Sequence, residues 1–298
     1  MTVPDHPARL SVGVIGAGRV GTALGAALAR AGHRVVAASG VSDASHDRVR
    51  ARLGEDIPMA EPPDVLSRAD LALLTVPDDV LPGLVRGLAG TGAPLAGKLL
   101  VHTSGRYGVG VLAPAAREGA LPMALHPVMT FTGRPEDVDR LASISFGVTA
   151  PEPLRTVAEA LVVEMGGEPV LIAEERRALY HAALASGANH LVTLVAEAAD
   201  LLRLAGVEAP DRMLGPLLGA ALDNGLRLGA AGLTGPVARG DSGTVAEHLA
   251  ELRRVAPETL PAYVALARLT ADRAMTAGLL KPEDAERLLD VLSNEGVR

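Results

Sequence analysis

The chain has 298 residues, of which 48% are apolar and only 2% aromatic, and its formal net charge is -7 at pH 7. This length predicts about two domains of ordinary size, with a core that must be built from Leu, Val and Ala. The negative charge argues against nucleic acid as a partner, because there is no excess of basic side chains to displace counterions.

The sequence contains no cysteine, which excludes disulfides, thiolate catalysis and zinc–thiolate sites. This fits a reducing compartment, and we expect a cytoplasmic location. Residues 1–9 lack the apolar segment of a signal peptide. The chain also has no uninterrupted run of about 20 apolar residues. We therefore expect neither secretion nor a membrane partner.

The first predicted strand, Val12–Ile15, leads into a glycine-rich turn and an Ala- and Leu-rich helix from about Arg19 to Ala31. The turn is a G-x-G-x-x-G motif formed by Gly16, Ala17, Gly18, Arg19, Val20 and Gly21. In the order strand, turn, helix this motif predicts dinucleotide binding, with the diphosphate on the free N–H groups of the helix N-terminus. Gly16 allows the tight turn, Gly18 lets the backbone approach the diphosphate, and Gly21 lets the helix pack against the strand. The alternative is a tight turn that holds no ligand.

The second predicted strand, His33–Ala38, ends without the carboxylate that binds the ribose 2′-hydroxyl of NAD in this type of site. A missing acid removes the repulsion that a 2′-phosphate would meet, and Ser39, Ser42 and Arg48 could hold such a phosphate. We therefore expect NADP as the cofactor. Asp43 could be a displaced acid, which leaves NAD possible, and the loop could also be merely solvated.

Strands then alternate with helices as far as about Ala173. The further strands are Asp70–Val76, Leu99–His102, Leu121–Leu125, Ser145–Thr149 and Glu168–Ile172. This alternation predicts an α/β fold, a doubly wound and mostly parallel Rossmann sheet over residues 1–173. From residue 174 no strand pattern recurs, and the predicted helices are Glu174–Ala205, Asp211–Ala230, Thr244–Val255, Pro257–Ala277 and Pro282–Leu292. We expect an all-α C-terminal domain over residues 174–298.

Ligands of open α/β sheets bind beyond the carboxyl ends of the strands. A nicotinamide is therefore expected over the turn of Thr75, Val76 and Pro77 and near Ser104. His126 and His102 follow or end strands at the same edge, and histidine is a common acid–base group. For His102 we favour a structural role with a backbone partner, whereas both readings stay open for His126. No carboxylate lies at ligand spacing beside the histidines, so a metal site is not expected.

The long helix after residue 174 carries a polar stripe, because Ser186, Asn189, Thr193 and Glu197 recur on one face. Burying unpaired polar groups costs free energy, so this stripe could line a wet cleft against the sheet. It could also simply face bulk solvent. The loop Thr234–Asp241 contains Arg239, which could bind the carboxylate of a small acid, or the loop could be an ordinary connection between helices.

Six motifs together resemble the Rossmann-like oxidoreductases that have a helical C-terminal domain of unknown function. They are the glycine turn, TVPDD, HTSG, HP-x-x-TF, ASGANHLVTL and LTGPVARGD, and they cover nearly the whole chain. The resemblance extends to the wider 6-phosphogluconate-dehydrogenase-like class, with ketopantoate reductase, pyrroline-5-carboxylate reductase and prephenate dehydrogenase. It implies NADP or NAD binding, an active site between the domains, and a homodimer built by the helical domain.

The resemblance transfers unevenly to single residues. Asn189 is similar to the helix asparagine of the ketopantoate-type enzymes, but their catalytic lysine one turn earlier is replaced by Ala185. His126 and Ser104 are similar to the His-Pro and Ser turns that meet substrate in prephenate dehydrogenase. This similarity makes His126 the preferred proton donor, with Ser104 and Asn189 as its helpers. Ser186, Thr193 and Arg239 are candidates for substrate binding.

We therefore predict an NADP-dependent oxidoreductase that reduces a small 2-oxo acid or imine; a ketopantoate-like substrate is implied by the resemblance only. The lost lysine keeps a second hypothesis open, a non-catalytic sensor that binds NADP(H) without turnover. A third hypothesis is an interaction module whose helical half only dimerises. Consumption of NADPH, binding without turnover, and no binding of either dinucleotide distinguish the three hypotheses.

Overall fold

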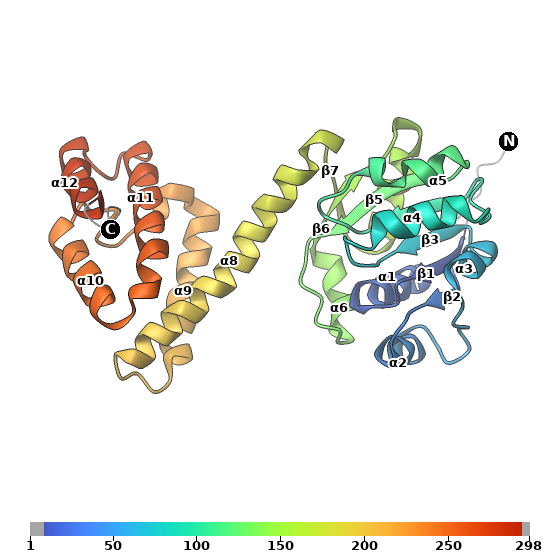
Figure 1. The fold of residues 1–298 in the computed structure, drawn as a ribbon, viewed down its shortest axis with the longest axis horizontal. Coiled ribbons are helices and arrows are strands. Elements are labelled where there is room, and N and C mark those ends of the chain that lie inside the picture. Colours follow the sequence, from blue (N-terminus) through green and yellow to red (C-terminus); the bar gives the residue numbers. More distant parts are fainter. Residues whose placement is uncertain (1–8, 294–298) are drawn as a thin grey trace. The chain divides into compact units, whose positions relative to one another are not determined.

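The structure is a computed structural model that describes residues 9–293. The chain divides into two compact units, Met1–Ser186 and Gly187–Arg298. Figure 1 shows the helices and strands of each unit. Each unit buries its own apolar residues. The expectation that residues 1–9 are no signal peptide concerns a segment that, apart from Arg9, lies outside the described residues.

The first unit contains one seven-stranded sheet. Its strands are β1 (Ser11–Ile15), β2 (Arg34–Ser39), β3 (Leu71–Leu74), β4 (Leu99–His102), β5 (Leu121–Pro127), β6 (Ser145–Thr149) and β7 (Glu168–Leu171). They are arranged in the order β2-β1-β3-β4-β5-β6-β7. All neighbouring strands run parallel except β5 and β6, which pair antiparallel, with His126 opposite Gly147. The predicted doubly wound, mostly parallel sheet is confirmed.

Helices cover both faces of this sheet. One face carries α1 (Arg19–Arg30), α2 (Asp43–Arg52), α6 (Glu136–Arg140) and α7 (Arg155–Glu164). The other carries α3 (Pro62–Arg68), α4 (Leu81–Gly90) and α5 (Ala113–Arg117), with the short helix η1 (Val109–Leu112). Side chains of β1 alternate between the two layers, as the period of a strand requires: Val12 and Val14 face the first, and Ile15 faces the second.

The topology creates a crevice between β1 and β3. From β1 the chain passes through α1 to β2 at the edge, and then returns across the sheet to β3. The helices that follow β1 and β3, α1 and α4, therefore lie on opposite faces. Such a reversal of strand order leaves the carboxyl ends of the two strands uncovered, and ligands of open α/β sheets bind there.

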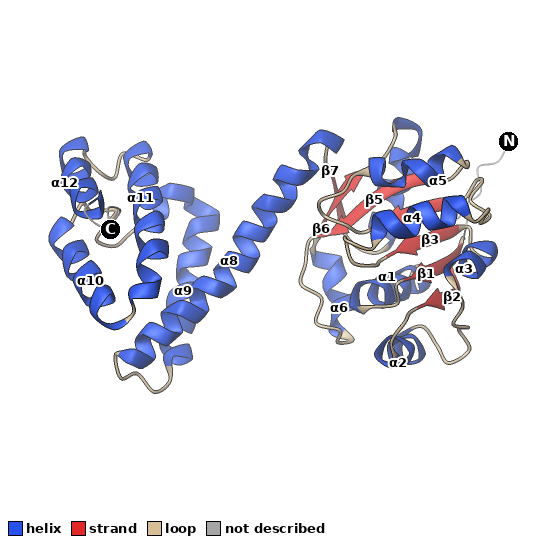
Figure 2. Cartoon of the chain, viewed as in Figure 1, coloured by secondary structure: helices blue, strands red, loops and turns tan. Residues whose placement is uncertain are grey.

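Up to residue 293 the second unit contains helices and loops only, which confirms the expected helical C-terminal region (Figure 2). It comprises most of α8 (Arg177–Leu204) with α9 (Pro210–Leu228), α10 (Ser242–Val255), α11 (Leu260–Thr276), α12 (Pro282–Ser293) and the short helices η5 (Gly229–Gly232) and η6 (Pro257–Thr259). Its core is formed by α10, α11 and α12, around Val245, Ala271 and Leu288.

The boundary between the units lies inside α8, although the sequence suggested a division near Ala173. The reason is that the first turns of α8 pack on the sheet. Arg177 is only 1% exposed and donates hydrogen bonds to the carbonyls of Ser104 after β4, Ala124 in β5 and Gly147 in β6. A residue that follows the last strand can thus still belong to the sheet's unit.

Candidate functional site

The glycine-rich turn joins β1 to α1 at the crevice. Gly16 has a φ of 95°, a left-handed conformation that favours glycine. The amides of Gly16 and Ala17 both donate to the Ser39 carbonyl, at 3.0 and 2.8 Å, which ties the turn to the end of β2. Gly18 is the N-cap of α1, and it offers no side chain to the N–H groups of the first turn. These donors therefore point out of the helix without a capping partner.

The turn is also tied to β3. The Thr75 hydroxyl donates to the Gly16 carbonyl at 2.6 Å, and a Cβ at Gly21 would lie 2.3 Å from that same hydroxyl oxygen. By contrast, a Cβ at Gly18 would meet only the Gly16 carbonyl oxygen, at 3.9 Å. Gly21 is thus required by packing inside the protein, whereas the space beside Gly18 is open. Val76 and Pro77 follow Thr75, and the Pro77 carbonyl accepts the amides that begin α4.

The segment after β2 brings basic groups next to this turn. Ser42 caps α2 by accepting the Ser45 amide at 3.2 Å, so its hydroxyl is already engaged. Arg48, one and a half turns further, donates through its Nη1 to the Ala44 carbonyl at 2.9 Å. Arg52 donates through Nη2 to the Gly133 carbonyl in the loop after β5.

Two buried guanidinium nitrogens of this helix have no hydrogen-bond partner within residues 9–293. They are Nε of Arg48 and Nη1 of Arg52. Buried donors without partners are rare in proteins, because each one loses its hydrogen bond to water. The sequence singled out Arg48 but missed Arg52, whose place beside the loop after β5 is not visible in local sequence.

A second cluster lies at the other end of the site, around His126 on β5. The His126 Nδ1 is 2.8 Å from the Tyr180 hydroxyl oxygen of α8, and the two rings meet edge to face. The His181 ring lies edge to face with His126 at 6.1 Å between centroids. The sequence proposed His126 and missed Tyr180 and His181 as its neighbours, because 54 residues separate His126 from Tyr180.

Two glycines make this cluster possible. A Cβ at Gly105 would lie 2.5 Å from His181 Cδ2 and 3.0 Å from His126 Nε2. A Cβ at Gly147 would lie 2.4 Å from the Tyr180 hydroxyl. A side chain at either glycine would displace an aromatic ring. Glycine at positions 105 and 147 is therefore the sequence feature that indicates this cluster.

Arg177 connects the cluster around His126 to the sheet through its hydrogen bonds. Its Nε donates to the Thr149 hydroxyl at 2.9 Å, and its Nη2 donates to the carbonyls of Ala124 and Gly147 at 3.0 and 3.2 Å. The guanidinium carbon is 5.8 Å from the centre of the Tyr180 ring. This buried cation faces no carboxylate at ion-pair distance in the described part of the chain, and its charge therefore acts on its neighbours.

The electrostatic surroundings keep His126 neutral. Burial lowers the pKa of its imidazole to about 4, and electrostatic interactions with Arg177 and His181 act in the same direction. Burial raises the pKa of the Tyr180 phenol, which therefore keeps its proton at neutral pH. The pair is thus an uncharged imidazole beside an uncharged phenol.

His102 is a structural residue, as the sequence favoured. Its Nδ1 accepts the Ser104 amide at 3.2 Å and its Nε2 donates to the Gly108 carbonyl at 2.9 Å. Burial, opposed only by that second hydrogen bond, lowers the pKa of His102 to about 4. Ser104 is 7% exposed and its hydroxyl oxygen accepts the Tyr107 amide at 3.2 Å, which closes the turn after β4.

The remaining predicted residues lie on α8 and on the loop before α10. Ser186, Asn189 and Thr193 are exposed on α8, and the Thr193 hydroxyl donates to the Asn189 carbonyl of its own helix at 3.3 Å. Arg239 is exposed in the loop, and its side chain makes no hydrogen bond or ion pair with any part of the chain that the structure describes. Ser186 closes the first unit, and the other three belong to the second.

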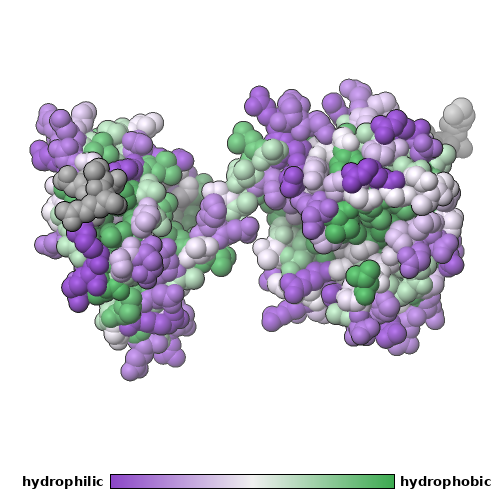
Figure 3. Space-filling model, in the orientation of Figure 1, coloured by the Kyte–Doolittle hydropathy of each residue, from purple (hydrophilic) through white to green (hydrophobic). Residues whose placement is uncertain are grey.

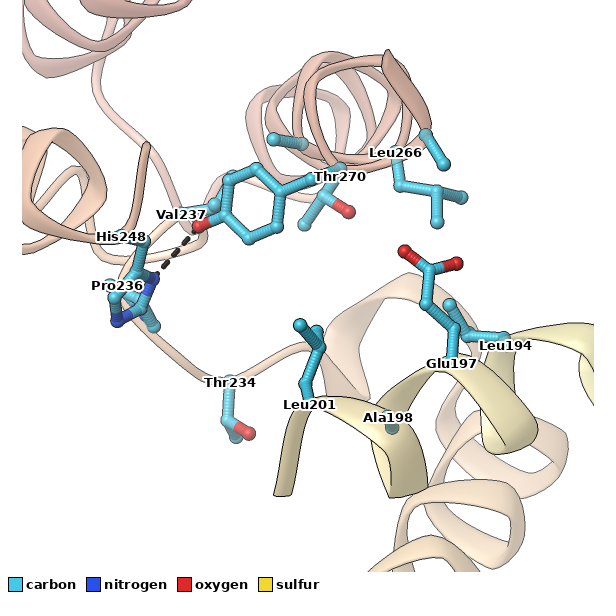
Figure 4. A pocket seen from close by; sticks show the side chains of 13 residues that line it. Leu194, Glu197, Ala198, Leu201, Thr234, Pro236, Val237, His248, Leu266 and Thr270 are labelled. Carbon is cyan, nitrogen blue, oxygen red and sulfur yellow. Dashed lines mark hydrogen bonds between the residues drawn. The ribbon is translucent and has the colours of Figure 1, made fainter. Parts of the chain in front are cut away.

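The second unit contains a cavity of about 360 Å³ between α8, α10 and α11 (Figure 4). Its walls are mainly apolar, and the Glu197 carboxylate reaches into it from α8 opposite Leu266 (Figure 4). At one end His248 Nδ1 is 2.9 Å from the Tyr263 hydroxyl oxygen. The lining residues are Leu194, Glu197, Ala198, Leu201, Thr234, Pro236, Val237, His248, Ala262, Tyr263, Leu266, Ala267 and Thr270.

Two further findings concern the described residues as a whole. No three His, Asp or Glu side chains among residues 9–293 lie close enough together to hold a metal ion. Within the same range, none of the helices combines the length and the apolar character needed to cross a membrane.

The three-layer α/β unit followed by helices defines a Rossmann-like protein with a helical C-terminal region. Sequence comparison agrees: residues 2–127 match a Rossmann-like domain, and residues 144–270 match a domain of unknown function, DUF2520. The chain therefore carries a Rossmann-like domain followed by a DUF2520 domain, as the motifs had suggested. No curated protein sequence matches the chain significantly.

Several solved structures share this fold across nearly the whole chain. A candidate NADP oxidoreductase from Bacteroides fragilis is 22% identical, with a TM-score of 0.70, over 89% of this chain and 98% of that one. An imine reductase from a Pseudomonas species is 22% identical, with a TM-score of 0.65, over 96% and 100%. A reductive aminase from Aspergillus terreus, solved with NADPH and ethyl levulinate, is 18% identical, with a TM-score of 0.64, over 94% and 99%.

Proposed function

We propose that this protein is an NADP-dependent oxidoreductase that reduces a small 2-oxo acid or imine. The observation that carries the proposal is the set of unpaired donors around the glycine-rich turn. The first-turn amides of α1 have no side-chain cap, the space beside Gly18 is open, and two buried arginine nitrogens of α2 lack partners among the described residues. Donors of this kind suit the diphosphate and the 2′-phosphate of NADP.

The residues at the crevice would hold the dinucleotide as follows. The amides of Arg19, Val20 and Gly21 would face the diphosphate, while Ser39, Arg48 and Arg52 would surround the 2′-phosphate. Thr75, Val76 and Pro77 would lie beside the nicotinamide ring. When bound, the reduced cofactor supplies the hydride. An NAD cofactor fits less well, because the donors on α2 would then remain unpaired.

The chemistry of the substrate would fall to His126. The residue lies at the carboxyl end of β5, two strands from β3, and neighbouring strands are about 4.8 Å apart. The ends of β3 and β5 are thus roughly 10 Å apart, a span that a small substrate and the His126 side chain together would bridge. His126 would donate a proton to the carbonyl oxygen or imine nitrogen. Ser104 closes the adjoining turn, and Asn189, Ser186, Thr193 and Arg239 remain candidates for holding the substrate.

A test of the cofactor compares the dissociation constants of NADPH and NADH for three arginine variants. Arg48→Ala and Arg52→Ala should each weaken NADPH binding by roughly tenfold or more, since each removes a charge-assisted hydrogen bond, and should leave NADH binding unchanged. Arg50→Ala is the matched control, because Arg50 is exposed on the same helix and pairs with Asp47. Equal affinity of the wild type for both dinucleotides would refute the preference for NADP.

The replacement of the usual lysine by Ala185 favours one rival, a sensor that binds NADP(H) without turnover. NADPH oxidation is measured at 340 nm with a panel of 2-oxo acids and cyclic imines. Consumption with any of them supports the enzyme. Tight NADPH binding without consumption by any compound of the panel supports the sensor, and failure to bind either dinucleotide supports an interaction module.

We also propose that the helical unit forms a homodimer. Helices α8 and α9 expose many large apolar side chains in the single chain, among them Val192, Met213, Leu217 and Leu226. Figure 3 shows apolar surface, in green, on the helical unit. Leu226 is 79% exposed. Soluble monomers rarely leave such surfaces open to water, so a second copy would cover them.

A further inference from the structure

The hydrogen bond between His126 and Tyr180 raises a question about the direction of its proton. A neutral imidazole carries one proton, either on Nδ1 or on Nε2. Only a proton on Nε2 can be given to a substrate, because Nδ1 faces the Tyr180 hydroxyl. The tautomer of His126 therefore decides whether it can donate at all.

We propose that Tyr180 is a positioning residue for His126: its phenol O–H donates to Nδ1, fixes the imidazole as the Nε2–H tautomer, and supplies the second proton of a relay. The proposal assigns no direct contact between Tyr180 and the substrate. The relay step rests on the proposed reductase function, whereas the tautomer assignment does not depend on it.

The surroundings of the phenol oxygen set the direction of the hydrogen bond. The Gly147 backbone amide acts on this oxygen and lowers the pKa of Tyr180, against the larger opposite effect of burial. Within residues 9–293 the acceptor at hydrogen-bond distance from the phenol is the His126 Nδ1, at 2.8 Å, so the phenol gives its proton to that nitrogen. The Arg177 donors cannot replace it, because they are directed at Thr149 and at main-chain carbonyls.

The packing holds both rings in this arrangement. The missing side chain of Gly147 makes room for the phenol, and that of Gly105 makes room for the edge of His126 that carries Nε2. His126 and Gly147 are directly opposite each other in the antiparallel pair of β5 and β6. The hydrogen bond thus connects the first turns of α8 to a rigid part of the sheet.

The relay balances as follows. As hydride reaches the carbonyl or imine carbon, the oxygen or nitrogen of the substrate takes the proton from Nε2 of His126, and Nδ1 takes the phenol proton of Tyr180. The imidazole stays neutral while the substrate is protonated, and the phenolate that forms lies beside the Gly147 amide and near the Arg177 guanidinium. A solvent proton then returns to Nε2, and the Nδ1 proton returns to the phenolate.

The electrostatics favour such a relay over an imidazolium donor. Four neighbours face His126: the cation Arg177, the second imidazole His181, the phenol of Tyr180 and the buried His102. None is an anion, so nothing stabilises a positive charge on the ring. A phenol that supplies the proton avoids that charge altogether.

A second histidine–tyrosine pair in the chain can be compared with His126 and Tyr180. In the second unit His248 and Tyr263 form a pair of nearly the same geometry, with 2.9 Å between Nδ1 and the hydroxyl oxygen and rings edge to face. That pair lies on α10 and α11, remote in sequence from the cluster around His126. Tyr263→Phe therefore serves as the matched control for Tyr180→Phe.

The decisive experiment is long-range ¹H–¹⁵N correlation of the histidine rings at pH 7 in the wild-type chain and in both variants. In the wild type we expect a protonated Nε2 and an accepting Nδ1 for His126. Tyr180→Phe should turn His126 into a mixture of both tautomers, while Tyr263→Phe should leave its signals unchanged. A wild-type His126 protonated on Nδ1, or an unaltered tautomer in Tyr180→Phe, would overturn the proposal.

Turnover provides the second measurement. With any substrate that consumes NADPH, Tyr180→Phe should lower kcat by roughly ten- to a hundredfold with KM within about twofold, because only the proton supply changes. An unchanged kcat would overturn the relay. If wild-type protein does not bind NADPH, the proposed function fails, yet the ring signals of His126 still decide the tautomer.

Discussion

The imidazoles of His102 and His126 are both largely buried, and both are neutral at neutral pH. Burial is the first cause in both, and it lowers each pKa from the ordinary 6.5 to about 4. The unfolded chain binds protons on both residues below pH 6.5, whereas the folded chain does not until pH 4. Folding is therefore opposed by acid within this window.

We expect the free energy of unfolding to be constant above pH 6.5 with respect to these two groups and to fall as the pH drops from 6.5 to 4. The loss is at most about 3 kcal/mol for each histidine, from 1.36 kcal/mol per unit of pKa. Urea unfolding between pH 7.5 and 4.5 measures it, and His102→Gln should remove about half of the slope. Stability that rises on acidification through this window would contradict the lowered pKa values.

In the turn between β1 and α1, Gly18 and Gly21 have different roles, although both are simply glycines of the G-x-G-x-x-G motif. Gly21 touches Thr75 and the Gly16 carbonyl, so any side chain there would push α1 away from β3. Gly18 has extended backbone angles and open space, so a side chain there meets no protein atom closer than 3.9 Å. One glycine serves packing, and the other leaves room for a ligand.

The two alanine variants should therefore differ. Gly21→Ala should destabilise the protein by about 1–3 kcal/mol, a usual range for overpacking, and weaken NADPH binding as well. Gly18→Ala should leave the thermal midpoint within about 2 °C of the wild type and still weaken NADPH binding roughly tenfold or more, since its Cβ occupies the path of the diphosphate. Thermal unfolding and fluorescence titration with NADPH measure both effects. Unchanged binding in Gly18→Ala would speak against a diphosphate at this turn.

At the scale of the whole molecule, the two units differ in how many of their large apolar side chains are exposed to solvent. The sheet unit buries most of its large apolar residues in two layers, with Val163 among the exceptions, whereas α8 and α9 expose large apolar side chains along their length. A shared interface of at least about 2,000 Å² is typical of permanent homodimers, and two long helices with exposed leucines can supply it. The assembly would be part of the folded state and not an addition to it.

Light scattering coupled to gel filtration should give twice the 30.5 kDa mass of one chain. The double variant Leu217→Glu with Leu226→Glu should run as a monomer or precipitate, because four charges would enter the apolar interface of a dimer. Val163→Glu is the control: Val163 is 61% exposed on α7, in the other unit, and this variant should stay dimeric. A monomeric wild type at micromolar concentration would disprove the dimer.

The sequence by itself determined what depends on neighbours along the chain. Short apolar runs predicted the strands, their alternation with helical segments predicted the sheet, and the order strand, glycine turn, helix predicted where α1 begins, because these patterns follow from the local geometry of the backbone. Tertiary structure alone decided which distant residues meet. Tyr180 reaches His126 across 54 residues and Arg52 reaches Gly133 across 81. Those contacts depend on strand order and on the antiparallel pairing of β5 with β6, which no local pattern records.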